Sequence, residues 1–421
     1  MTADAVLAIL GLSLIVLGLS SKVVKEHALS PTVLAIAVGV LVGPHALSMI
    51  DVTTHAPRHV VLEQLSRITL AIAVVDITLR LRPSDLLSNA ARLGVLLGVV
   101  MPGMWLVTAW GAVVALGMSL PVALVLGACL TPTDPGVASA LVTGTMPNRS
   151  LPRRVRMTLQ AEAAANDGLA LPFVLFSGAL VAHPLGEALS TSGAKMGREL
   201  GVAVLVGIAV GWVIMKLVDV VGVHRLAEED WFPLASAGLA ISVLALAHLA
   251  GGTGVFAAFV AGLVFSEGVP EELREPIHEV HRSLTKLALT VTFVAFGAVL
   301  PIDEWGSVVG VTGAAFAAWV VILRRFPVAF LALRATGTGP ISTTFLAWSG
   351  PLGAAAIYYL AYSHRFPIPE AERFFAVGSA AIVASVVVQA AFAAAAVHAY
   401  RKRTGREEQE GDHLEIEGEL P

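Results

Sequence analysis

Two aspartates lie in the middle of long apolar stretches of the chain. Asp134 is in CLTPTDPGVAS, and Asp167 is in QAEAAANDGLALPFVLF. An ionisable side chain in a membrane-spanning segment is costly, so it is rare there and indicates a functional site. A carboxylate in such a place can hold either a proton or a small hard cation, because hard cations prefer oxygen ligands. The two aspartates therefore predict a site that binds protons or cations.

The residues just before Asp167 add polar groups to the same predicted helix. Glu162 and Asn166 are four residues apart, which places them on one helix face. Asp167 is one residue further, roughly 100° around the helix. We expect Glu162 to orient Asn166 while Asp167 faces a cavity.

Two adjacent arginines interrupt another apolar stretch, VVILRRFPVAFLAL. Arg324 or Arg325 is expected to pair with Glu162, which would leave a neutral structural pair beside a free acid. The alternative is that these long side chains extend to the cytoplasmic interface and keep their charge in water. The remaining polar residues within apolar runs are expected to make helix–helix contacts, and Asp76 to pair with Arg80; these residues are Arg67, Asp76, His248 and Gln389.

The composition excludes an ordinary soluble protein. Of the 421 residues, 56% are hydrophobic and 14% are charged, and the mean hydropathy is +0.80. Soluble domains are about 45–50% apolar and about 25% charged. The net charge of −4 gives no basic excess that would indicate nucleic-acid binding. Cys129 is the only cysteine, which excludes an intramolecular disulfide and a multi-cysteine metal site.

The apolar runs predict an all-α polytopic membrane protein with about thirteen transmembrane helices, since each crossing takes about 20 apolar residues. The first run has Asp4 where a signal peptide would be basic, so we expect a retained helix. The runs lie near residues 4–21, 29–48, 60–80, 92–117, 119–144, 152–182, 196–221, 231–249, 252–268, 283–300, 306–333, 341–362 and 372–399.

The basic residues predict the orientation of the chain. Most of the 27 Lys and Arg residues fall at helix ends and loops that an external N-terminus would place inside. Cytoplasmic loops are enriched in Lys and Arg, so we expect an external N-terminus and a cytoplasmic C-terminus in the cell inner (plasma) membrane. Residues 404–421 are polar and acidic, and we expect a disordered cytoplasmic tail there.

Two of the predicted spans contain helix-breaking residues at corresponding places. Pro132 and Pro135 flank Asp134 in the fifth span, and Ser349-Gly350-Pro351 lies in the twelfth. The pattern predicts two inverted six-helix repeats, joined by a seventh span, with crossed discontinuous helices in spans 5 and 12. Such repeats are typical of secondary transporters. The alternative is that these residues only kink two ordinary helices.

The motif TPTDP, followed by EAAANDGLALPF, resembles the monovalent cation/proton antiporter superfamily, in particular its NhaP-type sodium/proton antiporters. The resemblance covers nearly the whole chain. It implies a transmembrane antiporter domain over residues 1–403, with a core of 92–182 and 306–399 and a dimerisation scaffold of 1–80 and 196–300. It further implies a homodimer in which the core moves relative to the scaffold.

The resemblance also implies roles for single residues. It makes Asp167 the acid that carries the proton or cation, places Asp134 at the helix crossing and gives Thr133 as an oxygen ligand. It assigns supporting roles to Glu162, Asn166 and Arg325. Two positions depart from the family pattern: Ala163 replaces a serine that helps to bind the ion, and Leu352 replaces a frequent Arg or Lys.

The expected activity is the exchange of protons for monovalent cations, Na⁺ with Li⁺ as a further candidate, without cofactors. The Asn-Asp pair resembles the electroneutral members of the family. Exchange of K⁺ for protons is the main alternative, because Ala163 removes a close ligand. A passive cation channel is a weaker one. Paired acids within a membrane also occur in intramembrane aspartyl proteases. The Gly-x-Gly-Asp sequence of those enzymes is missing here, so we expect no enzyme.

Overall fold

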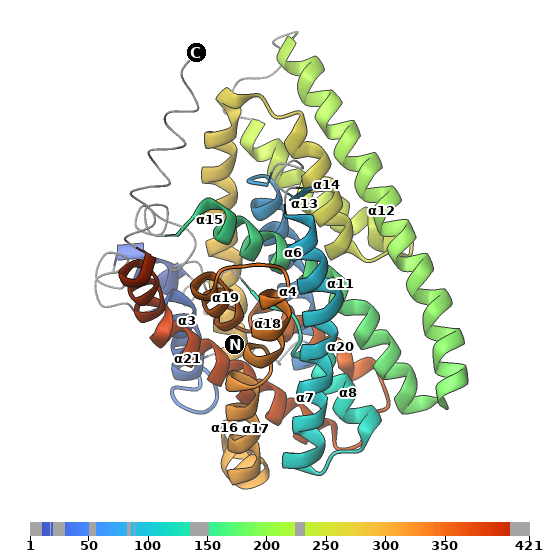
Figure 1. Cartoon of the computed structure of the whole chain (residues 1–421), viewed down its shortest axis with the longest axis vertical. Coiled ribbons are helices and arrows are strands. Elements are labelled where there is room, and N and C mark those ends of the chain that lie inside the picture. Colours follow the sequence, from blue (N-terminus) through green and yellow to red (C-terminus); the bar gives the residue numbers. More distant parts are fainter. Residues whose placement is uncertain are drawn as a thin grey trace.

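The computed structural model describes residues 11–16, 18–19, 30–49, 56–81, 86–87, 89–134, 151–223 and 232–404, and all its regular elements in these ranges are helices (Figure 1). Within these ranges, five helical segments are long and apolar enough to cross a membrane. Most of the first predicted span, the chain after Asp134 in the fifth span, and the tail from residue 405 lie outside the described residues. The five segments are Ala90–Leu116, Arg153–Ala182, Leu185–Val218, Gly310–Arg334 and Ala371–Ala393.

One group of helices packs mainly among itself. Its members α3 and α15 approach so closely that a Cβ at Gly39 would lie 2.1 Å from the carbonyl oxygen of Val294. A Cβ at Gly297 would lie 2.3 Å from the carbonyl oxygen of Ile36, so both glycines are required for backbone contact. The group consists of α3 (Pro31–Val42), α4 (Arg58–Thr78), α12 (Leu185–Val223), α13 (Phe232–Leu249), α14 (Gly254–Glu267) and α15 (Glu271–Ala298).

The other helices surround the two predicted interruptions. Figure 1 shows them in the lower and middle part of the view, while α12 runs along one edge of the molecule. The residue ranges predicted for the core and the scaffold correspond to these two groups of helices. The roles of the two groups stay a prediction. The second group consists of α6 (Ala90–Val95), η1 (Leu96–Val100), α7 (Met101–Leu116), α8 (Leu120–Cys129), α11 (Arg153–Ala182), α16 (Ile302–Glu304), η3 (Trp305–Val309), α17 (Gly310–Ile322), α18 (Phe326–Arg334), α19 (Pro340–Trp348), α20 (Ala354–Tyr362), η4 (Ser363–Arg365) and α21 (Ala371–Thr404).

Both predicted interruptions are present. Helix α8 ends at Cys129, and the chain from Leu130 to Asp134 is not helical. Helix α19 ends at Trp348, and α20 begins only at Ala354. Proline lacks the backbone N–H that would continue a helix, and it clashes with the preceding turn.

The eleventh predicted span, by contrast, is not one continuous helix. It is interrupted after α17, and α18 begins at Phe326 with Pro327 in its first turn. A proline ring clashes with the carbonyl four residues earlier, here that of Leu323, which is where the regular helix stops. Arg324 and Arg325 therefore lie in an irregular connection, where two adjacent side chains can point to different partners.

Two helices extend well beyond their predicted membrane spans. Helix α12 begins at Leu185 and α15 at Glu271, each about three turns before the apolar run. The added turns contain charged residues such as Glu187 and Arg274. An apolar run marks only the part of a helix that suits hydrocarbon, so polar extensions of the same helix are missed.

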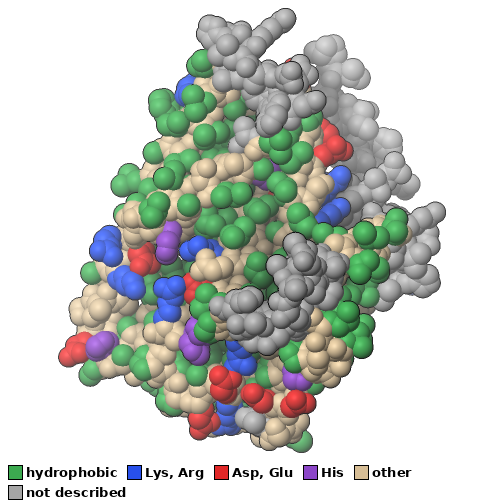
Figure 2. All heavy atoms as spheres, turned by 180° about the vertical axis from the view of Figure 1, so that it is seen from behind, with side chains coloured by type: hydrophobic (Ala, Val, Ile, Leu, Met, Phe, Trp, Pro, Cys, Tyr) green, Lys and Arg blue, Asp and Glu red, His purple; other side chains and the backbone are tan. Residues whose placement is uncertain are grey.

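The face of the molecule that is drawn in Figure 2 is largely apolar. Figure 2 shows hydrophobic side chains over much of one face, with acidic, basic and histidine side chains mainly toward its lower part. Charged contacts also join α4 to the chain around α20 and α21. Arg58 pairs with Glu372, and Arg365 pairs with Glu63 at 2.5 Å. A cavity of about 170 Å³ lies here, between Arg58 and the η4–α21 connection.

Candidate functional site

The two interruptions meet at Asp134. The backbone N–H of Asp134 donates to the carbonyl oxygen of Pro351 at 2.9 Å. The backbone N–H of Ala354, the first residue of α20, donates to Asp134 Oδ2 at 3.0 Å. The N-terminus of a helix carries partial positive charge, so the carboxylate of Asp134 is stabilised there. Gly353 permits this approach, because a Cβ there would lie 2.0 Å from Asp134 Oδ2.

Asp167 is buried beside Asp134, and only 3% of its surface is exposed. Its Oδ1 atom has no hydrogen-bond partner among the described residues. The hydroxyl of Tyr359 donates to the backbone carbonyl of Asp167 at 2.5 Å, which links α20 to α11. A buried polar atom without a partner is costly, so it points to an occupant such as a proton or a cation.

Asn166 joins α11 to the first interruption. Its Nδ2 donates to Thr133 Oγ1 at 2.7 Å, and its Oδ1 accepts from the backbone N–H of Thr133 at 3.2 Å. The Thr133 hydroxyl oxygen thus accepts a hydrogen bond from Asn166, and its own hydrogen is still available to donate. The paired bonds fix the position of Thr133 next to Asp134.

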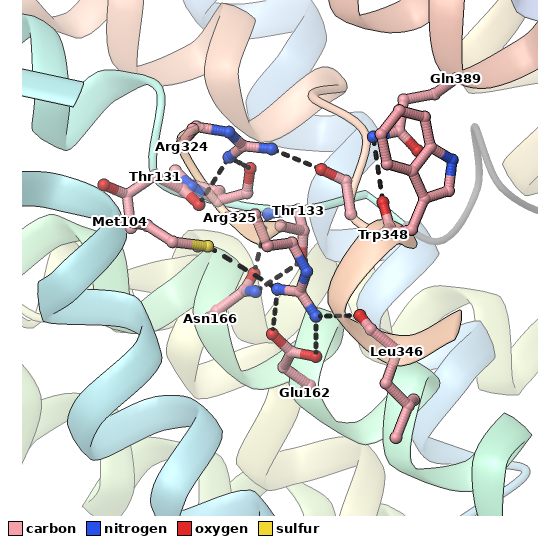
Figure 3. Close-up of polar contacts among 12 residues, drawn as sticks. Met104, Thr131, Thr133, Glu162, Asn166, Arg324, Arg325, Leu346, Trp348 and Gln389 are labelled. Carbon is pink, nitrogen blue, oxygen red and sulfur yellow. Dashed lines mark hydrogen bonds and ion pairs between the residues drawn. The ribbon is translucent and has the colours of Figure 1, made fainter. Parts of the chain in front are cut away.

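Glu162 pairs with Arg325. The guanidinium of Arg325 donates to both carboxylate oxygens, at 2.6 and 2.9 Å, and also to the carbonyl oxygen of Leu346 at 3.1 Å (Figure 3). Both side chains are almost fully buried. The expectation that Glu162 orients Asn166 was wrong, because Thr133 binds Asn166 and the carboxylate faces Arg325.

Arg324 points away from Glu162 and toward the two interruptions. Its guanidinium donates to the carbonyl oxygens of Leu130 at 2.8 Å and Thr131 at 3.2 Å. It also donates to the carbonyl oxygen of Gly350. Only 2% of its surface is exposed, so neither arginine extends to a membrane interface as the alternative required.

The sequence did not indicate two of the groups at the site. Tyr359 lies in an aromatic run, YYLAY, and nothing in that run marks its contact with Asp167. Cys129 at the end of α8 is buried, and its thiol donates to the carbonyl oxygen of Tyr359 at 3.2 Å. Gln389 was expected to make a helix–helix contact, and its Nε2 does donate to the carbonyl oxygen of Trp348 at 3.1 Å.

The arrangement can hold one small cation. In the part of the chain that the structure describes, no three His, Cys, Asp or Glu residues gather as they would around a metal ion. The available oxygens are the carboxylates of Asp134 and Asp167 and neutral neighbours such as Thr133. Such a set suits a hard cation, which a proton can replace on a carboxylate.

Known proteins match this chain over most of its length. The family described as "Sodium/hydrogen exchanger, transmembrane" matches residues 9–397. The Na(+)/H(+) antiporter 2 of Zygosaccharomyces rouxii is 25% identical over 373 residues, which are 82% of this chain and 44% of that protein. The K(+)/H(+) antiporter NhaP2 of Shewanella oneidensis is 28% identical over 275 residues, or 64% of this chain and 45% of that protein. The chain thus spans less than half the length of these relatives.

The fold is also that of a solved antiporter. The sodium proton antiporter MjNhaP1 from Methanocaldococcus jannaschii superposes with a TM-score of 0.75 at 19% identity. The match covers 93% of this chain and 97% of that one. The predicted relation to sodium/proton antiporters is confirmed by the family match. The chain therefore belongs to the sodium/hydrogen exchanger family.

Proposed function

We propose that this protein exchanges protons for monovalent cations, Na⁺ with Li⁺ as a further candidate, across the membrane. The observation that carries the proposal is a carboxylate oxygen of Asp167 that has no hydrogen-bond partner among the described residues and is buried beside Asp134, where two helix interruptions meet. Asp167 binds either a proton or a cation, and competition for this carboxylate couples the two flows. Asp134 and Thr133 supply further oxygens to the cation.

The charge of the Asp167 carboxylate determines which forms of the site can move across the membrane. Moving a bare charge through a low-dielectric barrier is costly, whereas a carboxylate with a proton or a monovalent cation is neutral. The site therefore moves across the membrane slowly when Asp167 is empty and charged. It moves readily when Asp167 carries either a proton or a cation. Glu162, Asn166, Arg325 and Arg324 hold the surrounding helices in place.

The finer architecture belongs to the same proposal. We infer about thirteen spans in two inverted repeats, since about 20 residues cross the hydrocarbon. The core of residues 92–182 and 306–399 moves against the scaffold of 1–80 and 196–300 in a homodimer. The N-terminus is outside, and the C-terminus is cytoplasmic in the plasma membrane. The two groups of helices and the meeting of the interruptions support this arrangement.

Exchange in proteoliposomes tests the proposal directly. Vesicles containing the protein and a pH-sensitive dye receive a pulse of Na⁺, Li⁺ or K⁺ outside. We expect Na⁺ to drive proton movement that depends on the protein. A cation current without proton movement would instead identify a passive channel.

Exchange of K⁺ for protons is the second candidate. Ala163, one residue after Glu162, has no hydroxyl, and the related NhaP2 of Shewanella oneidensis is named a K(+)/H(+) antiporter. Ala163→Ser is expected to raise the ratio of Na⁺-driven to K⁺-driven exchange by about fivefold, since one polar contact contributes about 1 kcal/mol. Ala164→Ser, on the same helix, serves as the control. An unchanged ratio would contradict a ligand position at residue 163.

Exchange is expected to be electroneutral, with one proton moved for each cation. A potassium gradient with valinomycin imposes a membrane potential without touching the protein. Because no net charge moves, the rate of Na⁺-driven exchange should stay the same at either sign of the potential. A rate that follows the potential would show that the stoichiometry differs from one to one.

A further inference from the structure

Residues at the start of α4 contact the chain between η4 and α21 through two ion pairs and one stacked pair of rings. The imidazole rings of His59 and His364 lie nearly parallel, with 3.8 Å between their centroids and 17° between their planes. Six residues take part, and we refer to them as the latch. They are Arg58, His59 and Glu63 in α4, His364 and Arg365 in η4, and Glu372 in α21.

The latch joins the two groups of helices to each other. Helix α4 belongs to the first group, whereas η4 and α21 belong to the second. In the proposed orientation, the start of α4 is at the outer end of the molecule. The proposed movement of one group against the other therefore requires these contacts to part. Both histidines line the cavity of about 170 Å³ at this end, and His364 is exposed, so water and protons reach the rings.

The stacked rings make the latch sensitive to pH. An imidazole ordinarily takes up a proton near pH 6.5, and the two rings can remain stacked only while at most one of them is charged. Two unit charges 4 Å apart repel each other enough to change an equilibrium constant about fivefold even in bulk water. Protons therefore bind more readily when the rings are apart, and acid shifts the equilibrium toward the open latch.

The other charged groups around the rings keep their charge in the range where imidazole titrates. Carboxylic acids ordinarily titrate near pH 4 and guanidinium groups above pH 12, so the histidines alone change charge between pH 5.5 and 8. These groups are Arg58 and Glu63 in α4, Arg365 in η4, Glu372 in α21 and Glu304 in α16, which acts on Arg58.

One further contact at this end has the opposite response to acid. His45, after α3, lies 3.3 Å from Asp303 in α16, and protonation of His45 would strengthen this pair. However, 91% of the Asp303 side chain is exposed, so water screens the attraction. The stacked pair therefore dominates the response of the outer end to pH.

We propose that the latch keeps the outer end closed and that external protons release it by charging His59 and His364. The inference rests on the proposed exchange function and orientation. A proton on Asp167 competes with the transported cation, whereas a proton on the latch speeds the opening of the path to that site. An acidic exterior thus acts on the rate of opening separately from its action on the carboxylate.

The first test compares pH profiles in proteoliposomes. Exchange of labelled for unlabelled Na⁺, at equal saturating concentration and equal pH on both sides, reports the movement without a proton gradient. His364→Phe keeps a ring that can stack but cannot be protonated. With each rate divided by its own value at pH 8, the wild type should be about fivefold faster than this variant at pH 5.5.

His59→Phe should have the same profile as His364→Phe, because either substitution leaves one protonatable ring in the stack. Asp167 is present in all three proteins, so competition at that carboxylate cancels in the comparison. Coinciding normalised profiles of the wild type and the two variants would overturn the proposal.

The second test joins the two sides of the latch covalently. In the double variant His59→Cys with His364→Cys, a short bifunctional methanethiosulfonate links the thiols, and mass spectrometry measures the linked fraction. Exchange should fall at least about tenfold and return when a reductant releases the link. The single variants, treated alike, report any effect of the reagent itself. Undiminished exchange by the linked protein would overturn the proposal.

A link within one group of helices is the matched control. Glu370→Cys with Arg373→Cys places two thiols at an exposed ion pair near the start of α21, and both positions belong to the second group. The same reagent should leave exchange by this variant unchanged. An equal loss in the control would show that linking the latch has no specific effect, which would contradict the proposal.

The proposed function itself is judged on the untreated wild-type protein in the same vesicles. Absence of cation-driven proton movement there refutes the antiporter assignment before any variant is compared. Wild-type exchange with a pH profile equal to that of His364→Phe refutes only the latch. The two failures are therefore distinguishable.

Discussion

Asp167→Asn is expected to reduce cation–proton exchange to background while the protein folds as the wild type does. Asparagine has almost the same shape as aspartate. Its amide does not take up a proton at physiological pH, and it has no negative charge to neutralise a cation. Since Oδ1 of Asp167 has no hydrogen-bond partner among the described residues, the substitution removes no such bond from that atom. Dye-based exchange in proteoliposomes measures the loss, and thermal unfolding in detergent measures the fold.

Asp76→Asn is the matched control for this experiment. Asp76 in α4 is also a buried carboxylate, but its Oδ1 accepts from Arg80 at 2.8 Å, two residues after the end of that helix. Its loss should lower stability and leave exchange in place. Clear cation-driven proton movement by Asp167→Asn would disprove that Asp167 is the shared acid.

The second large effect concerns the ion pair between Glu162 and Arg325. Glu162→Gln leaves the guanidinium of Arg325 buried without its countercharge. Removal of one partner of a buried pair costs about 3–5 kcal/mol, so we expect a marked fall in the apparent melting temperature. Arg325→Gln should cost a similar amount, because it leaves the carboxylate of Glu162 uncompensated.

A double variant separates the ion pair from the packing around it. Glu162→Gln combined with Arg325→Met removes both charges of the pair, so the melting temperature should recover a large part of the loss. Glu370→Gln, which removes an exposed pair with Arg373, should change stability by less than about 1 kcal/mol. Independent, additive losses at residues 162 and 325 would contradict the pairing.

The interruptions were predictable because their cause is local. Each break contains more than one helix-breaking residue, Pro132 and Pro135 in the first and Gly350 and Pro351 in the second, whereas the single Pro172 is accommodated inside α11. The polar cluster near Asp167 was predictable as well, since buried ionisable residues are conspicuous in an apolar sequence. In the structure α8 ends at Cys129 and α19 at Trp348, and Asp167 is buried beside Asp134.

Other features depend on tertiary structure. Neighbouring positions 324 and 325 carry the same side chain, so no sequence rule decides which of them pairs with Glu162. The choice follows from the irregular connection before α18, which directs one guanidinium to Glu162 and the other to backbone carbonyls. The bond from Tyr359 to Asp167 joins residues 192 positions apart, a distance over which local patterns carry no information.

Cys129 allows the helix crossing to be studied by chemical labelling. Its thiol is buried between α8 and the carbonyl of Tyr359, at the place where the two interrupted segments meet. A membrane-permeant maleimide can react only when α8 and α20 separate, and no other thiol in the sequence competes. The rate of alkylation therefore reports the frequency of local opening, as hydrogen exchange does for amides. The wild-type chain thus contains its own probe of how rigid the crossing is with and without bound cation.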